Sequence, residues 1–307
     1  MSDLAIVIPA YKSDFLYQTL DSFAQQSNKN FTLYVGDDYS PFDLESIVRR
    51  FQDKMEITYH RFENNLGGKD LVSHWSRCVD LVEEEDWIWL FSDDDLAGIN
   101  CVEAFYHLKD KDSFDVLHFD INIIDSYNNV IRECPNFPEI ISSPIFFEKL
   151  FRRQITARMP EFIFRRKALL EKGFVNFDMA WRTDTATIMS LGNPLGIRTI
   201  NETGTKVLWR ASDQNISSLL PLMERKNLVN LCYFNWADEF FKNNGLKCPF
   251  SKFRLIKTIV FELEFRGAVG FFKDGIYAVR ELTFLSAPNK LLFICFMFYR
   301  LIYRLHE

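Results

Sequence analysis

Short apolar runs alternate with amphipathic segments over the first hundred residues, and this alternation constrains the fold more than any other feature. Apolar runs at 4–9, 31–38, 56–62 and 87–91 predict four strands. Segments at 14–27, 43–51 and 69–82 carry apolar residues at helical spacing and predict three helices. Strands of continuous apolar character are typical of parallel sheets covered on both faces. The order therefore predicts the α/β class.

The rest of the chain is more mixed. Residues 115–125, 161–166 and 204–212 predict further strands, and 143–153 and 177–192 predict helices. From about Ser217 onward the pattern is helical. We therefore expect an α/β domain over residues 1–215 and a C-terminal helical region over 216–307.

Polar side chains follow the apolar strands. Ligands of open parallel sheets bind beyond the carboxyl ends of the strands. We therefore expect the polar residues at these ends to line one crevice, namely Tyr11, Asp37, Asp38, Asp93, Asp94 and Asp95.

The three successive aspartates after 87–91 allow two interpretations. Carboxylates about 4 Å apart repel by ~4 kcal/mol at an effective dielectric near 20, so such a trio needs a cation, a proton or exposure to water. One interpretation is a site for Mg²⁺ or a similar hard cation that shares a donor phosphate. The other is an exposed acidic turn that caps the helix expected near Ile99.

Composition excludes some classes of function. The formal net charge of −6 argues against a nucleic-acid partner, whose phosphates attract basic proteins. The 6 cysteines form no C-x-x-C pair, which favours reduced thiols in the cytoplasm over zinc or disulfides. The N-terminal residues lack a secretory pattern, and the late apolar run 291–299 is too short for a membrane span.

The last 62 residues carry ten Lys or Arg against five Asp or Glu, although the whole chain is acidic. Within them, 289–307 sets Lys290, Arg300 and Arg304 among large apolar side chains. This pattern predicts peripheral contact with a membrane interface, on its cytoplasmic side. The alternatives are a last core helix or a homodimer contact.

The ordered motifs of the first hundred residues resemble family 2 glycosyltransferases, nucleotide-sugar enzymes of the GT-A fold. That opening has an apolar strand, P-x-Y, a helix with L-x-S-x-x-x-Q, a second strand and a D-D pair. "ENNLGG" at 63–68 resembles the family's N-x-G segment, and "WLFSDDDL" at 89–96 its D-x-D-type metal motif. Seven residues fill the places of the opening: Pro9, Tyr11, Leu20, Ser22, Gln26, Asp37 and Asp38.

The resemblance implies a Rossmann-like, mostly parallel central sheet and a set of donor contacts. Asp38 corresponds to the residue that binds the uracil base, and Pro9 and Tyr11 would wall the base and ribose. Lys69 lies where a basic residue often meets the nucleotide, although a solvent-exposed lysine is the alternative.

Within the trio, Asp94 corresponds to the ligand of Mg²⁺ or Mn²⁺. Asp93 would face the ribose and a metal-bound water, and Asp95 the sugar or the residues behind it. The chain departs from the usual pattern at Ser92, where many members have the first aspartate, and at Lys12.

The resemblance also implies a general base, because transfer with inversion requires one to deprotonate the acceptor hydroxyl. Asp184 in "AWRTDTATIMSLG" corresponds to this base, with an ordinary helix-surface carboxylate as the alternative. Glu161 is the reserve candidate or an acceptor contact. Other expected contacts are Trp181 and Arg182 with the acceptor, and Trp209 and Arg210 with the donor sugar or diphosphate.

The expected function is therefore transfer of a hexose from a nucleotide donor, expected to be a UDP-sugar, to a glycan or lipid-linked acceptor. A Mg²⁺-dependent phosphatase or phosphotransferase is an alternative, although its nucleophilic aspartate would follow the first strand, where Pro9-Ala10-Tyr11 stands. A non-catalytic sugar-nucleotide-binding protein on the same fold is the third possibility.

Overall fold

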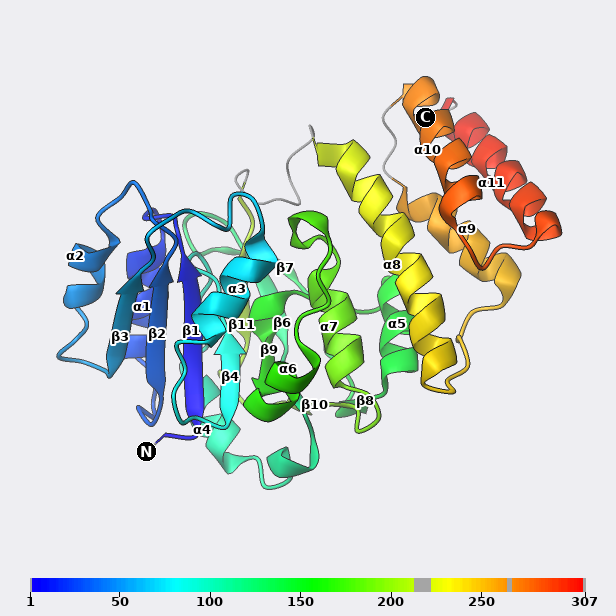
Figure 1. The fold of residues 1–307 in the computed structure, drawn as a ribbon. Coiled ribbons are helices and arrows are strands. Elements are labelled where there is room, and N and C mark those ends of the chain that lie inside the picture. The colour runs from blue at the N-terminus through cyan, green and yellow to red at the C-terminus, as the bar shows by residue number, and fades with distance from the viewer. Residues whose placement is uncertain (1, 213–221, 264–266, 306–307) are drawn as a thin grey trace.

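A computed structural model describes residues 2–212, 222–263 and 267–305 of the protein. A central sheet of eight strands has the order β3-β2-β1-β4-β9-β5-β10-β8 (Figure 1). The strands β3, β2, β1 and β4 are parallel, as predicted, and so are β5 and β10. β9 is antiparallel to β4 and β5, and β8 is antiparallel to β10. The strands are β1 Leu4–Ala10, β2 Thr32–Asp37, β3 Ile57–Arg61, β4 Trp87–Leu90, β5 Val116–Phe119, β8 Ile140–Ile141, β9 Phe162–Arg165 and β10 Ile197–Ile200.

Helices cover both faces of this sheet. Ile6 and Ile8 of β1 pack in one hydrophobic core with α1 Leu16–Ala24, α2 Leu44–Arg49 and α4 Cys101–His107. Ala5 and Val7 pack in the other core with α3 Leu71–Val79, α5 Ser143–Phe151, α6 Arg166–Lys172 and α7 Thr183–Leu191. β1, β2 and β4 are thus buried from both sides, whereas β3 at the edge of the sheet is largely exposed.

The segment 115–125 is two strands instead of the one that its pattern predicts. β5 belongs to the central sheet, whereas β6 Ile121–Ile124 joins a second sheet with β7 Val130–Glu133 and β11 Val207–Arg210. The break falls at Asp120, whose carboxylate accepts a hydrogen bond from the Phe137 N–H. β11 also reaches the turn after β4 through a bridge between Leu96 and Leu208.

The expected helix over 177–192 is shorter than its pattern predicts. α7 begins at Thr183, and a single 3-10 turn, Asp178–Ala180, precedes it. Met179, Ala180 and Arg182 have φ values of 60°, 54° and 67°, which a continuous helix excludes. Such strained backbone persists only where surrounding contacts impose it.

Within the described residues after 221, the chain forms four helices, α8 Met223–Asn243, α9 Lys252–Glu262, α10 Gly267–Glu281 and α11 Ala287–Leu305. Tyr233 and Phe234 of α8 pack against Phe147 and Phe151 of α5, so this region extends a core of the α/β part. None of the described helices has the length and apolar character needed to cross a bilayer. The boundary expected at 215/216 lies outside the described residues.

Candidate functional site

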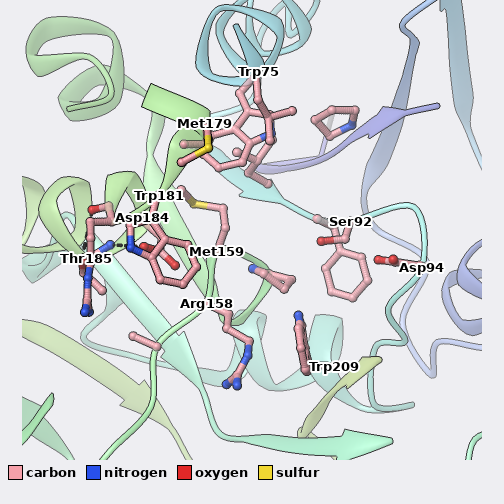
Figure 2. Close-up of a pocket in the computed structure, with 18 of the residues that line it drawn as sticks. Trp75, Ser92, Asp94, Arg158, Met159, Met179, Trp181, Asp184, Thr185 and Trp209 are labelled. Atoms are coloured by element: carbon pink, nitrogen blue, oxygen red, sulfur yellow. Dashed lines mark hydrogen bonds between the residues drawn. The ribbon is translucent and has the colours of Figure 1, made fainter. Parts of the chain in front are cut away.

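A cavity of about 1240 Å³ opens at the carboxyl ends of β1 and β4. Figure 2 shows Ser92 and Asp94 on one side of it and Asp184 and Thr185 on the other. Of the residues predicted to form a site, the cavity is lined by Pro9, Tyr11, Asp38, Asp93, Asp94, Trp181, Arg182, Asp184 and Trp209. Lys69, Asp95, Glu161, Arg210 and also Asp37 do not line it.

The acidic turn after β4 is buried, so the interpretation as an exposed turn is wrong. Asp93 and Asp94 are 6% and 7% exposed, and Asp95 is fully buried. Asp93 Oδ2 accepts hydrogen bonds from the backbone N–H groups of Tyr11 at 2.9 Å and Lys12 at 2.8 Å. Asp94 Oδ2 lies 2.5 Å from Lys12 Nζ. The segment that follows β1 therefore supplies the partners of both carboxylates.

Burial is the main influence on the ionisation of this turn. Burial and the neighbouring Asp94 raise the pKa of Asp93 to about 6, while Lys12 opposes the shift. Burial and Asp94 also raise the pKa of Asp95 well above its usual value. Crowded carboxylates in a low dielectric behave in this way, because each disfavours the charged form of the next.

Asp95 and Arg210 lie behind the turn. The Arg210 backbone N–H donates to Asp95 Oδ1 at 2.7 Å, and Arg210 Nε donates to the carbonyl oxygen of Asp94 at 2.8 Å. Arg210 also donates to the carbonyl of Asp125 and to Gln18 Oε1, and its side chain is fully buried. β11 thus places Arg210 on the side of the turn away from the cavity, where the hydrogen bonds of Arg210 hold the turn in place.

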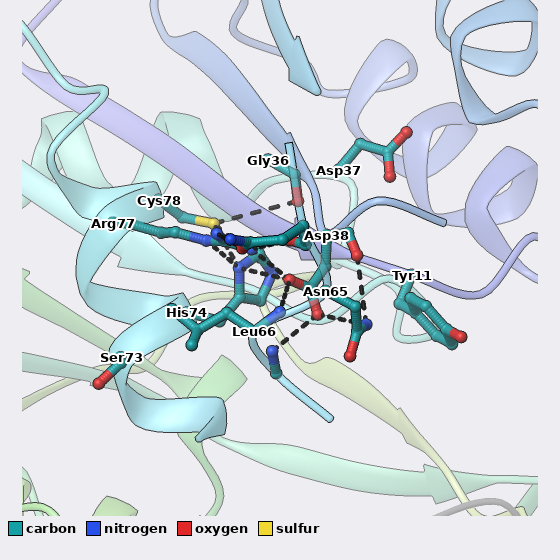
Figure 3. Close-up of polar contacts among 12 residues, drawn as sticks. Tyr11, Gly36, Asp37, Asp38, Asn65, Leu66, Ser73, His74, Arg77 and Cys78 are labelled. Atoms are coloured by element: carbon teal, nitrogen blue, oxygen red, sulfur yellow. Dashed lines mark hydrogen bonds and ion pairs between the residues drawn. The ribbon is translucent and has the colours of Figure 1, made fainter. Parts of the chain in front are cut away.

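Asp38, at the end of β2, is the centre of a polar cluster (Figure 3). Its carboxylate accepts hydrogen bonds from the N–H groups of Leu66 and Gly67, both at 2.8 Å, and from Asn65 Nδ2 at 2.9 Å. The guanidinium of Arg77 pairs with the same carboxylate. These donors come from the "ENNLGG" segment and α3, so Asp38 fastens that segment to the edge of the cavity.

Two polar residues near this cluster lie away from the cavity. Asp37 points away from the cluster in Figure 3 and pairs with Arg61 and Tyr59 of β3. Lys69 is exposed before the start of α3. Pro9 and Tyr11, by contrast, border the cavity beside Asp38 and Asp93.

Asp184 lies in the first turn of α7, on the side of the cavity opposite the acidic turn (Figure 2). Its Oδ1 accepts a hydrogen bond from the Thr185 N–H at 2.7 Å. Burial raises the pKa of Asp184, and the positive charges of Arg182 and Arg158 oppose the shift. A carboxylate with a raised pKa that borders a cavity is suited to accept a proton.

Side chains of the C-terminal helices hold the residues beside Asp184. Asn230 Oδ1 of α8 accepts hydrogen bonds from Trp181 Nε1 at 3.1 Å and from Arg182 Nε at 2.8 Å. Arg182 also pairs with Glu262 of α9. On the floor of the cavity, the guanidinium of Arg158 lies 4.3 Å from the ring centre of Trp209. The sequence offered no signal for Asn230, Glu262 or Arg158, because no spacing relates them to the motifs.

Residues 5–174 match the family described as Glycosyl transferase family 2, which is more than half of the chain. The protein belongs to glycosyl transferase family 2. A comparison with curated protein sequences gives no significant match. The alternative of a phosphatase or phosphotransferase does not agree with this membership, and β1 ends in Pro9-Ala10 where such an enzyme needs a nucleophilic aspartate.

Solved structures share the fold of this family 2 protein. S. aureus TarS 1-349 in complex with UDP-GlcNAc has a TM-score of 0.67 at 13% identity, over 92% of this chain and 82% of that chain. The mannosyltransferase PcManGT from Pyrobaculum calidifontis, in complex with GDP-Man and Mn²⁺, has a TM-score of 0.55 at 14% identity, over 95% and 79%. The similarity extends beyond the family match, to the C-terminal helices, and establishes the GT-A fold.

Glu161, the reserve candidate for the base, is fully buried beside β9 of this family 2 fold. Its two oxygens contact the Arg158 N–H and His118 Nε2, the latter at 3.2 Å. Burial raises the pKa of Glu161 well above its usual value and lowers the pKa of His118 to about 3. His118 is therefore uncharged near neutral pH. The side chain of Glu161 points towards His118 and the Arg158 N–H, and it does not line the cavity.

The acidic turn fits a hard divalent cation that is completed by phosphate oxygens. Among the described residues, no group of three or more His, Cys, Asp or Glu is arranged to hold a metal ion. Mg²⁺ and similar ions, however, are commonly bound through one or two carboxylates together with substrate phosphates. Asp93 and Asp94 supply two buried carboxylates at the cavity, and a cationic group, Lys12 Nζ, already contacts them.

Proposed function

We propose that the protein transfers a hexose, with inversion, from a UDP-sugar to a hydroxyl of a glycan or lipid-linked acceptor. The observation that carries this proposal is the cavity, which has Asp93 and Asp94 on one side and Asp184 on the other (Figure 2). A diphosphate requires positive charge on one side of the reacting carbon, and an acceptor hydroxyl requires a base on the other. Asp93 and Asp94 would meet the first requirement through a bound divalent cation, and Asp184 would meet the second.

In the donor half of the cavity, the nucleotide would bind between Tyr11 and the segment 65–67, which is hydrogen-bonded to Asp38. Pro9 and Tyr11 border the cavity where β1 ends, and Gly67 and Gly68 border it as well. A side chain at Gly67 would press on the Asp38 carboxylate and one at Gly68 on the Asn65 amide, so glycine at these positions lets the segment pack closely against Asp38. Asp38 already accepts three hydrogen bonds from Asn65, Leu66 and Gly67. It therefore contributes to base binding chiefly by holding this segment in place.

Asp184 would act as the general base. The acceptor hydroxyl oxygen forms a bond to the anomeric carbon while the bond from that carbon to the diphosphate oxygen breaks. The hydroxyl proton passes to the Asp184 carboxylate, and the nucleoside diphosphate leaves with the electron pair. Attack from the side of Asp184, opposite the acidic turn, inverts the configuration at the anomeric carbon.

Asp93 and Asp94 would hold Mg²⁺ or Mn²⁺ next to the diphosphate. A bound divalent cation neutralises the charge that develops on the leaving group. Asp94 has its Oδ2 toward Lys12, and Arg210 holds its carbonyl from behind. The turn is therefore fixed before any donor enters, which is the condition for electrostatic stabilisation without reorganisation.

The acceptor half is aromatic, which agrees with a glycan. Trp75 and Trp181 border the cavity together with Arg158 and Arg182. Aromatic faces bind the apolar faces of sugar rings, and the arginines provide donors to hydroxyl or phosphate oxygens. A sugar attached to a lipid phosphate would use both kinds of contact.

The last helices would bring the enzyme to the cytoplasmic face of a membrane. On α11, Leu291, Phe298 and Ile302 are 64%, 49% and 56% exposed. Lys273 and Arg280 on the neighbouring helix α10 are exposed too, whereas Arg300 of α11 is buried and donates to the carbonyl oxygens of Val260 and Leu263. Apolar side chains with flanking positive charge favour an anionic lipid surface.

A thermal-shift series with UDP-, GDP- and dTDP-sugars, each with and without Mn²⁺, tests the donor half. We expect a UDP-sugar to raise the Tm most, and the shift to fall in the Asp93→Asn variant. Stabilisation by no nucleotide would contradict the proposal. Binding without transfer or donor hydrolysis would favour the non-catalytic sugar-nucleotide-binding protein instead.

A further inference from the structure

Lys12 is in contact with the carboxylates that a divalent cation would use. Its Nζ lies 2.5 Å from Asp94 Oδ2 and 3.8 Å from Asp93 Oδ1. Its side chain is 28% exposed and borders the cavity. The ammonium thus lies between the acidic turn and the space where a donor diphosphate would enter.

The position of Lys12 is imposed by its own backbone. The N–H groups of Tyr11 and Lys12 both donate to Asp93 Oδ2, so the segment after β1 is fastened to the acidic turn. The side chain of Lys12 extends from this hydrogen-bonded segment directly to Asp94. Because the tether is short, the local concentration of the ammonium at Asp94 is high.

The net negative charge at the cavity is therefore smaller than the three aspartates of the turn would give. Asp95 is fully buried and accepts a hydrogen bond from the Arg210 backbone N–H, away from the cavity. Asp93 and Asp94 remain, and Lys12 contributes a positive charge of its own. The attraction of this site for a divalent cation is therefore weakened. The site also has a positive group available for a diphosphate.

We propose that Lys12 is a cation built into the donor site, which competes with a divalent ion for Asp94 and pairs with the diphosphate of the donor. This inference rests on the proposed function for the diphosphate and on the geometry of Lys12 and Asp94 for the competition. Divalent metal then binds the free protein weakly. Part of the nucleotide affinity is independent of metal.

Mn²⁺ binding to the full chain, followed by electron paramagnetic resonance without nucleotide, tests the competition. Lys12→Met keeps the length of the side chain and removes its charge. We expect it to tighten Mn²⁺ binding by about tenfold or more, because the competing cation is lost. Lys12→Arg retains the charge and should bind Mn²⁺ as weakly as the wild type. Lys12→Gln provides a second uncharged variant, and its Mn²⁺ affinity should follow that of Lys12→Met.

Two controls separate this effect from a general change of charge. Lys167→Met removes a lysine whose side chain is 82% exposed, on α6 and outside the cavity lining, and should leave Mn²⁺ affinity unchanged. Asp94→Asn introduced into Lys12→Met should abolish the gain. Unchanged Mn²⁺ affinity in both uncharged variants, or equal tightening in Lys12→Arg, would overturn the competition.

UDP binding in EDTA, measured by calorimetry, tests the pairing with the diphosphate. We expect the wild type to bind UDP without metal, and Lys12→Met to lose about tenfold or more of that affinity. Equal UDP affinity of the two proteins in EDTA would overturn the pairing. If the wild type binds no nucleotide under any condition, the proposed function fails, and the Mn²⁺ comparison still tests Lys12 by itself.

Discussion

Asn230 Oδ1 on α8 accepts a hydrogen bond of 2.8 Å from Arg182 Nε, two residues before the proposed base. The same oxygen accepts a hydrogen bond from Trp181 Nε1. Arg182 has a φ of 67°, which costs free energy for a residue with a side chain. The C-terminal helices thus hold the backbone that leads into Asp184.

Replacing Asn230 by Ala should impair transfer more than donor binding. Loss of the two hydrogen bonds leaves Trp181 Nε1 without this acceptor and Arg182 with Glu262 as its remaining carboxylate partner, so Asp184 and the acceptor wall are held less firmly. We expect kcat to fall by about tenfold or more while the Kd for UDP stays unchanged. Asn235→Ala is the matched control, because Asn235 lies on the same helix and contacts Glu281 and Thr283 instead. Equal kcat losses in the two variants would indicate a general effect on stability.

Asp184→Asn should remove the base and keep the shape of the site. We expect kcat to fall by about 10²–10⁴-fold, the usual contribution of a general base, with unchanged UDP affinity. Asp178→Asn is the control, since Asp178 is exposed and pairs with Arg225. Retained turnover in Asp184→Asn, measured as release of UDP, would assign the base to another group.

The pH dependence of kcat should report the raised pKa of Asp184. Its burial raises that pKa above the usual 3.8, and the charged form is the one that accepts a proton. Activity should therefore be lost as pH falls, with a midpoint above that of an ordinary aspartate. Arg158→Gln removes a positive charge that lowers this pKa, so its midpoint should lie higher still. The kcat of the wild type and of Arg158→Gln would be measured against pH at saturating donor. The same midpoint in the two proteins would contradict the assignment.

His74 should make stability depend on pH. Burial lowers the pKa of His74 to about 4, and Arg77 Nε donates to its Nδ1, which requires a neutral ring. An unfolded histidine takes up a proton near pH 6.5, before the folded one does. The unfolded state thus binds more protons between these values, so the free energy of unfolding should fall as pH drops from about 6.5 towards 4. Urea unfolding of His74→Gln should show a smaller slope over this range, and an unchanged slope would contradict the prediction.

The exposed stripe of α11 should be needed for membrane contact. We expect the double variant Leu291→Ser with Ile302→Ser to float less with anionic liposomes and to keep its donor hydrolysis. Leu195→Ser replaces a residue that is 47% exposed between α7 and β10, and should float as the wild type does. Equal flotation of all three proteins would remove the membrane proposal. Dissociation of a dimer in the double variant would assign the stripe to a second copy.

The sequence was sufficient for β1 to β4, the helices between them and the location of the acidic turn. These features depend on local patterns. A continuous apolar run followed by Asp93 and Asp94 indicates a buried strand with two carboxylates at its carboxyl end, and the order of residues in the chain is enough to infer this. The capping of α2 by Asp43, through the Ser46 N–H, is equally local. Local patterns did not predict the division of 115–125 at Asp120, because the two halves pair with strands that are far away in the chain.

Only the tertiary structure assigned partners to the polar residues. It brought Lys12 to Asp94, fastened Asp38 to the segment 65–67, and turned Glu161 towards His118 and away from the cavity. It also placed Arg210 behind the turn and brought Asn230 to Arg182, across 48 residues of chain. The reason is that residue type and spacing set which groups lie near the end of a strand or helix. Where each side chain points is decided by pairing and packing between segments that the local pattern does not relate.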